Sequence, residues 1–159
     1  MKLTKTWAIL GLFALVMACK SAADSPEEAK NHLTAVPEWT IDEVYVNDAL
    51  NFKDGKEVPN FGGISFNRYM ESVSFRADGS FVGKYSGQEE GNILHWEVDN
   101  AEQTILVTAA DSSQQDRSGW TIAPRTVYED SFEMTTITAA FDYPRTTKIT
   151  LKFRVKGED

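Results

Sequence analysis

Two glutamates that alternate with tyrosines along the chain are the residues best placed to do chemistry. Glu43 stands two positions before Tyr45, and Glu71 stands two positions after Tyr69. Because side chains two apart on a strand share a face, each carboxylate is expected on the same face as its apolar neighbours. A carboxylate that points inward needs a partner, a raised pKa or a wet cavity. We therefore predict a wet cavity for a ligand, lined by Glu43, Tyr45, Tyr69, Glu71 and Tyr85.

A β-bulge or a register shift would reverse this prediction. One extra residue in a strand sends the following side chains to the opposite face of the sheet. Both glutamates would then point to solvent and line no cavity. Of the two interpretations we favour this one, because an unpaired charge is expensive to bury.

The sequence contains no arrangement typical of a catalytic or metal site. Of its two histidines, His32 lies in a polar N-terminal segment and His95 has the solvent-facing parity of a strand. The Gly-Ile-Ser run at 63–65 begins like the nucleophile elbow of a hydrolase, but Asn67 stands where the last glycine is needed. We therefore predict that the protein is not an enzyme and needs no cofactor or metal.

The only cysteine, Cys19, ends a segment with the layout of an export signal. Lys2 and Lys5 precede an apolar run, Trp7 to Met17, that is too short to span a bilayer comfortably. Residues 16–19, Val-Met-Ala-Cys, resemble the lipobox of bacterial lipoproteins. The resemblance implies cleavage before Cys19. An ordinary secretory signal with a chance cysteine is the alternative.

The lipobox resemblance also implies a membrane anchor. The thiol of Cys19 would receive a diacylglyceryl group, and its freed amine an acyl chain such as palmitate. Because stable anchoring takes more than one acyl chain, these groups together would hold the protein on the membrane. Lys20, where inner-membrane lipoproteins of enteric bacteria carry Asp, favours the outer membrane of a bacterial cell envelope. The periplasmic and surface sides both stay open.

Length and charge limit the size and the partners of the mature protein. A chain of 159 residues has room for one domain with a hydrophobic core. A formal net charge of -8 argues against nucleic acid as a partner and against direct adhesion to anionic lipid. Residues 20–35 are rich in Ser, Ala, Asp and Glu, a composition typical of a mobile tether. We predict a signal peptide at 1–18, the lipidated cysteine and a flexible tether at 19–36, and the folded domain at 37–159.

Short runs of alternating apolar and polar residues fill the chain from Trp39 onward, with no helical period. Strands are expected at 39–46 and 148–155, a long connection at 49–66, and hairpins at 69–85, 93–108 and 120–138. About eight antiparallel strands can close into a barrel that encloses a small ligand. A β-sandwich satisfies the same pattern.

Three stretches, 37–44, 73–81 and 96–100, resemble successive landmarks of the lipocalin-like domains of many bacterial lipoproteins. The resemblance implies an all-β fold, a single antiparallel up-and-down barrel. In such a barrel the first strand starts with a tryptophan packed at the closed end, here Trp39. The sequence departs from the lipocalin pattern at Pro37, where lipocalins typically have a glycine.

Two functions are compatible with these patterns. The first is a membrane-anchored lipocalin-like lipoprotein that binds a small apolar or amphipathic molecule in its barrel. The alternative is a structural or protein-interaction lipoprotein with a side-chain-filled barrel, in which the segments 49–66 and 109–119 contact a protein partner. A cavity of roughly 300 to 1,000 Å³ inside the barrel would favour the first function.

Overall fold

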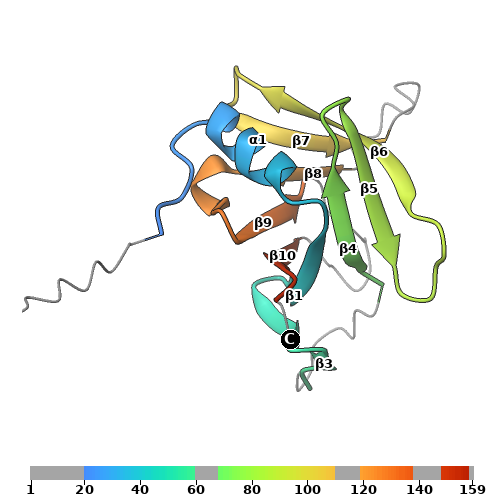
Figure 1. Ribbon diagram of the computed structural model, residues 1–159. Helices are drawn as coiled ribbons and strands as arrows, with labels where there is room; N and C mark the ends of the chain where they lie inside the picture. The colour runs from blue at the N-terminus through green and yellow to red at the C-terminus, as the bar shows by residue number, and fades with distance from the viewer. Residues whose placement is uncertain (1–19, 60–67, 110–118, 138–147, 158–159) are drawn as a thin grey trace, which may run out of the picture.

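The computed structural model describes residues 20–59, 68–109, 119–137 and 148–157 (Figure 1). Within these ranges the chain forms ten strands, one α-helix and one short 3₁₀ helix. The elements are α1 (Pro26–Ala35), β1 (Trp39–Val46), β2 (Ala49–Lys53), β3 (Lys56–Glu57), β4 (Met70–Phe75), β5 (Ser80–Tyr85), β6 (Asn92–Asp99), β7 (Thr104–Thr108), β8 (Gly119–Ile122), η1 (Pro124–Thr126), β9 (Ser131–Thr136) and β10 (Ile149–Val155).

Eight of the strands close into an antiparallel barrel. The strands β4 to β10 are neighbours in chain order, β4 pairs with β1, and β10 pairs with β1 to complete the ring. Each connection therefore joins adjacent strands, apart from the insertion of β2 and β3 between β1 and β4. The predicted up-and-down barrel is confirmed, and the β-sandwich alternative is wrong.

One edge of β1 pairs with β10, and the other edge pairs with two strands, β4 and β2. Trp39 and Thr40 pair with β4, whereas the residues from Glu43 to Val46 pair with β2. The turn between β1 and β2 is Asn47-Asp48, and both residues have positive φ angles, 50° and 65°, as a tight hairpin turn requires. The prediction of a long connection over 49–66 is thus wrong for its first half, which forms the hairpin of β2 and β3.

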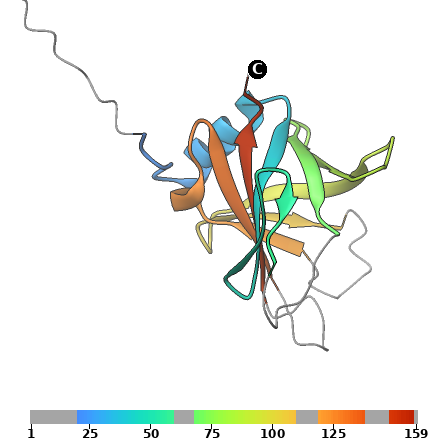
Figure 2. The same ribbon diagram turned by 90° about the horizontal axis from the view of Figure 1, so that it is seen from below.

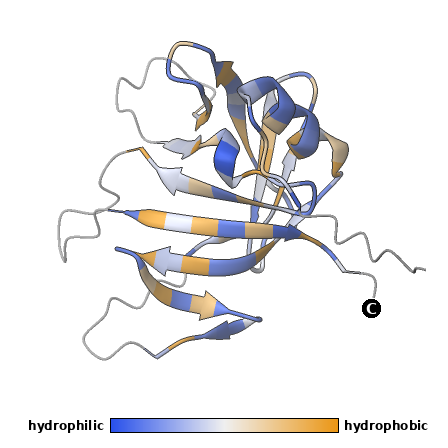
Figure 3. Cartoon of the chain, turned by 90° about the vertical axis from the view of Figure 1, so that its left-hand side faces the viewer, coloured by the Kyte–Doolittle hydropathy of each residue, from blue (hydrophilic) through white to orange (hydrophobic). Residues whose placement is uncertain are grey.

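Buried and exposed side chains alternate along the strands and define the inner and outer faces of the barrel. In β10, Leu151 and Phe153 are buried at 0% and 1% exposure, and Lys152 and Arg154 lie on the outer face. Figure 3 shows the same alternation of hydrophobic and hydrophilic residues along neighbouring strands. The first two predicted hairpins are confirmed as β4–β5 and β6–β7.

The third hairpin is interrupted. β8 ends at Ile122, η1 comes next, and pairing resumes only as a bridge between Val127 and Phe132. Pro124 explains the interruption, because it has no N–H for a strand ladder and its fixed φ suits the first turn of a helix. The predicted continuous strand over 120–128 is wrong at this point.

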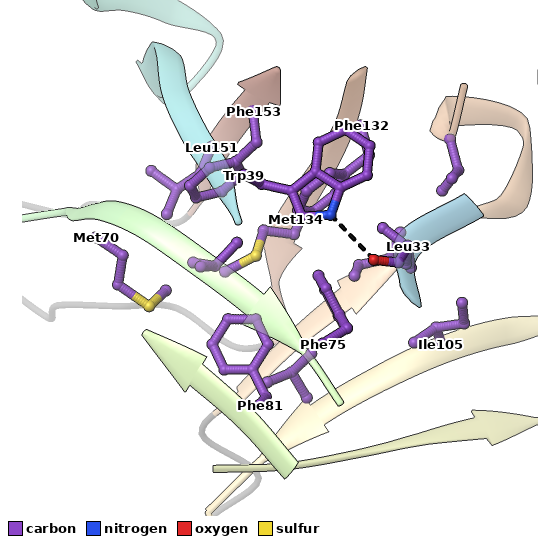
Figure 4. Close-up of a cluster of buried hydrophobic side chains, with 14 of the residues drawn as sticks. Leu33, Trp39, Met70, Phe75, Phe81, Ile105, Phe132, Met134, Leu151 and Phe153 are labelled. Carbon is purple, nitrogen blue, oxygen red and sulfur yellow. Dashed lines mark hydrogen bonds between the residues drawn. The ribbon is translucent and has the colours of Figure 1, made fainter. Parts of the chain in front are cut away.

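Aromatic side chains fill the barrel near the start of β1 (Figure 4). The ring of Phe132 stacks on Phe153, with centroids 5.0 Å apart, and meets Trp39 edge-on at 5.1 Å. Phe75 makes edge-to-face contacts with Phe81 and Phe132 at 5.1 and 5.5 Å. This end of the barrel is a packed core, and Trp39 occupies it as the lipocalin resemblance implied.

Helix α1 covers the same end of the barrel (Figure 2). Ser25 caps it by accepting a hydrogen bond from the Glu28 N–H, and Ala29 and Leu33, one turn apart, are fully buried. The indole Nε1–H of Trp39 donates to the Leu33 carbonyl at 3.1 Å (Figure 4). The predicted flexible tether over 19–36 is therefore wrong for the helix. The predicted signal peptide and Cys19 lie outside the described residues.

Candidate functional site at the distal end

The end of the barrel away from α1 is less tightly packed, and we call it the distal end. There β1, β5, β7 and β9 finish and β4, β6, β8 and β10 begin. Four large side chains at or near these strand ends are only partly buried, although they pack against the core: Tyr69, Tyr85, Leu94 and Trp120. Among the described residues, the distal end is thus where large apolar side chains of the barrel are only partly covered.

A cavity of about 210 Å³ lies at the distal end. Its lining is mainly apolar and consists of Leu94, Val107, Thr108, Ala109, Gly119 and Trp120. Val107 pairs with both Trp96 and Trp120 across the sheet, and Trp96 is buried, so these positions belong to the inner face. We call this feature the distal cavity. It is smaller than the roughly 300 Å³ at which most ligand sites begin, so it has room only for a small group or for one end of a longer molecule.

Tyr69 and Tyr85 lie on the same end but do not line the distal cavity. The ring of Tyr69 packs on Phe52 of β2, with centroids 4.8 Å apart, where β2 replaces β4 as the neighbour of β1. The guanidinium of Arg68 lies 5.7 Å from the ring centroid of Tyr85. Burial raises the pKa of Tyr69, with the nearby carboxylates of Glu71 and Glu57 as smaller causes, so its phenol is neutral at physiological pH.

Bulges place both predicted glutamates outside the barrel. The register of β4 shifts between Met70 and Ser72, so Met70 is buried and Glu71 is exposed. In β1 the register shifts between Ile41 and Glu43, which puts Val44 in the core in place of Glu43. The cavity with inward glutamates is therefore wrong, and the bulge alternative is confirmed. Ligand binding by the five residues stays a prediction that placement alone does not test.

On the outer wall, Glu43 forms the centre of an ion-pair network. Lys53 Nζ lies 2.7 Å from Glu43 Oε1, and the Tyr45 hydroxyl donates to Oε2 at 2.7 Å. Lys152 Nζ lies 3.6 Å from Glu43 and 3.0 Å from Glu133. The hydrogen bonds from Lys53 and Tyr45 hold the pKa of Glu43 below its usual 4.5. Glu43 is thus an ionised carboxylate with several partners, which suits a structural role better than proton transfer.

The two histidines lie on the surface, apart from the distal cavity. His95 points outward from β6, 4.0 Å from Glu97, as its parity predicted, and His32 lies in α1, 3.9 Å from Glu28. In the part of the chain that the structure describes, no three His, Cys, Asp or Glu side chains gather as metal ligands would. None of the helices formed by the described residues has the length and hydropathy to cross a membrane.

The fold therefore defines a class: a closed, eight-stranded antiparallel barrel whose closed end is covered by a helix and whose first strand opens with a buried tryptophan. This architecture is consistent with lipocalin-like domains. Comparison of the chain with family models, curated proteins and solved structures gave no match.

The residues of the distal cavity were only partly accessible to sequence reasoning. Because His95 has the solvent-facing parity, its neighbours Leu94 and Trp96 are expected to face inward, and both pack against the core. This alternation could not place a cavity beside Leu94, because that depends on which strand end faces Leu94 across the barrel. The sequence predicts a strand at Trp120, but the residues around Trp120 do not indicate that it is less buried than Trp39.

Proposed function

We propose that this protein is a membrane-anchored, lipocalin-like lipoprotein that binds a small apolar or amphipathic molecule at the distal end of its barrel. One observation supports this proposal above the others. The core is tightly packed near α1, whereas Leu94 and Trp120 stay partly exposed around the distal cavity.

The lining of the distal cavity indicates the chemistry of the ligand. None of the described residues that line it is charged, so a charged group placed there would lose its hydration without gaining a partner among them. Thr108 supplies the one side-chain hydroxyl of the lining. An apolar tail would pack beside Leu94, Val107 and Trp120, and a polar end of the ligand would remain in water.

The proposed anchor is acylation of Cys19 in the outer membrane. The Lys20 ammonium forms an ion pair with Asp130, and the Ala23 N–H donates to the Val127 carbonyl at 2.8 Å. The chain is thus attached to the barrel from the first residue after Cys19. Acyl chains there would hold the barrel close to the bilayer, without the long spacer that the composition of 20–35 had suggested.

The packed core supports a second candidate, an interaction lipoprotein without a ligand. Phe75, Phe81, Phe132 and Phe153 fill the interior near α1. Ile93, on the outer face near the distal end, is 63% exposed and could contact another protein.

The two candidate functions predict different effects of a Leu94 substitution on the binding of an apolar probe. We would titrate residues 20–159 with the fluorescent apolar probe N-phenyl-1-naphthylamine. The ligand-binding candidate predicts saturable binding that weakens about tenfold or more in Leu94→Gln, because an amide would be buried in the cavity. The matched control is Ile93→Gln on the outer face of the same strand, which should bind as the wild type does. Absence of saturable binding, or equal binding by both variants, would favour the interaction candidate.

A further inference from the structure

A row of threonines crosses the outer wall of the barrel. Thr135 pairs in register with Thr121 on one side and with Thr150 on the other, so the three side chains lie side by side on β8, β9 and β10. Neighbouring strands are ~4.8 Å apart, which sets the spacing of the row. The inward positions between them hold Met134 and Leu151, both fully buried, so the threonines belong to the outer face.

This row lies at the bottom of a groove. Tyr45 of β1 pairs with Thr150 and continues the row, and Arg125 and Thr126 of η1 also line the groove. The groove has a volume of about 460 Å³, within the range of small-molecule sites. Thr150 is only 8% exposed, although it is polar and on the outer face. We call this feature the threonine groove.

The hydroxyls of the groove have hydrogen-bonding capacity left for a ligand. Thr135 and Thr150 share one hydrogen bond of 3.1 Å, so one of the two hydroxyl protons is not used by the pair. Thr104 donates its single proton to the Ile122 carbonyl at 2.8 Å. Thr121 must therefore donate to Thr104, and its own oxygen is left as an acceptor. The floor thus offers both a donor and an acceptor.

Among the described residues that line the groove, one cation has no acidic partner. Lys148 pairs with Asp48 at 2.7 Å, and Lys152 pairs with Glu133 at 3.0 Å. Arg125 is exposed, and its side chain forms no hydrogen bond or ion pair with the other described residues. Arg125 therefore places a positive charge beside the row of hydroxyls.

We propose that the threonine groove binds an acidic saccharide. A sugar carries several hydroxyls that can match the spaced donors and acceptors of the floor, and its carboxylate would form a two-point contact with Arg125. An apolar ligand fits poorly, because it would remove water from threonines and ion pairs without replacing their hydrogen bonds. This site is separate from the distal cavity and does not depend on acylation of Cys19.

The hollowed surface does not end at Arg125. A second hollow of about 690 Å³ shares Thr121, Ala123 and Arg125 with the threonine groove. It extends over Thr104 and Leu106 of β7 towards Pro26 at the start of α1. Asp24 and Glu102 also line this second hollow, so the carboxylates of the saccharide would be held in the threonine groove, beside Arg125.

Isothermal titration of the full chain in detergent micelles with trigalacturonate tests this proposal, with neutral maltotriose as the comparison sugar. We expect trigalacturonate to bind at least about tenfold more tightly than maltotriose. Arg125→Gln should weaken binding of trigalacturonate about fivefold or more, because it removes the charged partner of the carboxylate. Thr135→Val, which removes a floor hydroxyl but keeps the side-chain shape, should weaken it about threefold or more.

Two matched variants control for general effects. Arg76→Gln removes an exposed arginine elsewhere on the barrel, and Thr40→Val removes a threonine from the outer face of β1 beyond the groove. Both should bind as the wild type does. The proposal is overturned if trigalacturonate does not bind at about 10 mM, if maltotriose binds equally well, or if Arg125→Gln has no more effect than Arg76→Gln. If Thr135→Val fails to fold, the exposed Arg125 still decides the outcome.

Discussion

At the scale of single residues, two bulges determine what the carboxylates of this protein can do. The shift at Glu43 and the shift at Glu71 each move a glutamate from the predicted inner face to the outer wall. Glu43 gains Lys53, Tyr45 and Lys152 as partners there, whereas Glu71 is left in solvent. The same residue type at the same predicted parity therefore has two different roles.

Replacing Glu43 with Gln should destabilise the protein by about 1–2 kcal/mol at neutral pH, because it removes a partly buried charged hydrogen-bond acceptor. The folded state lowers the pKa of Glu43, so its stabilisation is complete above its usual 4.5 and is lost as the pH falls through the folded-state pKa. Urea unfolding at a series of pH values should thus show the wild type and Glu43→Gln converging in acid.

Glu71→Gln is the matched control for this prediction. Because Glu71 is exposed, its replacement should change the free energy of unfolding by less than about 0.5 kcal/mol at any pH. A difference between the wild type and Glu43→Gln that stays constant down to acid pH would contradict an ionised Glu43 as its source.

At the scale of elements, most strands of the barrel were predictable, whereas β2, β3 and the helices were not. The alternation of β1, β4 to β7 and β10 is visible in the sequence because each of these strands has one wet and one buried face. Helix α1 buries chiefly Ala29 and Leu33 among polar neighbours, so its pattern is too weak to separate it from a tether. The pairings that create the threonine groove depend on register, which the sequence alone does not specify.

Docking of α1 should contribute strongly to stability. Leu33→Ala removes a fully buried side chain from the end of the barrel and should cost about 2–5 kcal/mol, measured by urea unfolding. Lys30→Ala, on the exposed side of the same helix, should cost less than about 0.5 kcal/mol. Equal effects of the two variants would mean that α1 does not pack on the barrel in solution.

The β4–β5 hairpin depends on Gly79. Its φ of 86° is unfavourable for any residue with a Cβ, and a Cβ there would lie 3.0 Å from Cε1 of His95. Gly79→Ala should therefore cost about 1–2 kcal/mol in thermal or urea unfolding. Gly157→Ala has open space around it and should have little effect. A neutral Gly79→Ala would show that the turn can adopt another geometry.

At the scale of the whole molecule, the N-terminal segment and the barrel form one unit. Lys20 and Ala23 bind the segment between η1 and β9, so a lipid on Cys19 would be attached directly beside the folded domain. The distal cavity lies at the opposite end from α1. Lys20, the residue next to the proposed anchor, and the proposed ligand site therefore belong to one folded unit.

Loss of the Lys20–Asp130 ion pair should make the peptide bond after Lys20 more accessible to proteases. In Asp130→Asn, trypsin should cut after Lys20 severalfold faster and release the barrel from membranes sooner, as measured by sedimentation. Glu129→Gln, the exposed neighbouring residue, should behave as the wild type does. Equal release from Asp130→Asn and Glu129→Gln would mean that the segment is not held by this contact.

The most direct measurement is native mass spectrometry of the full chain extracted gently from bacterial membranes. We expect a mature chain that begins at Cys19 and carries acyl groups. We also expect a further non-covalent apolar mass that is present in the wild type and in Ile93→Gln and absent from Leu94→Gln. A bare, unmodified Cys19 would contradict the anchor, and a wild-type barrel without any bound molecule would contradict ligand binding in the distal cavity.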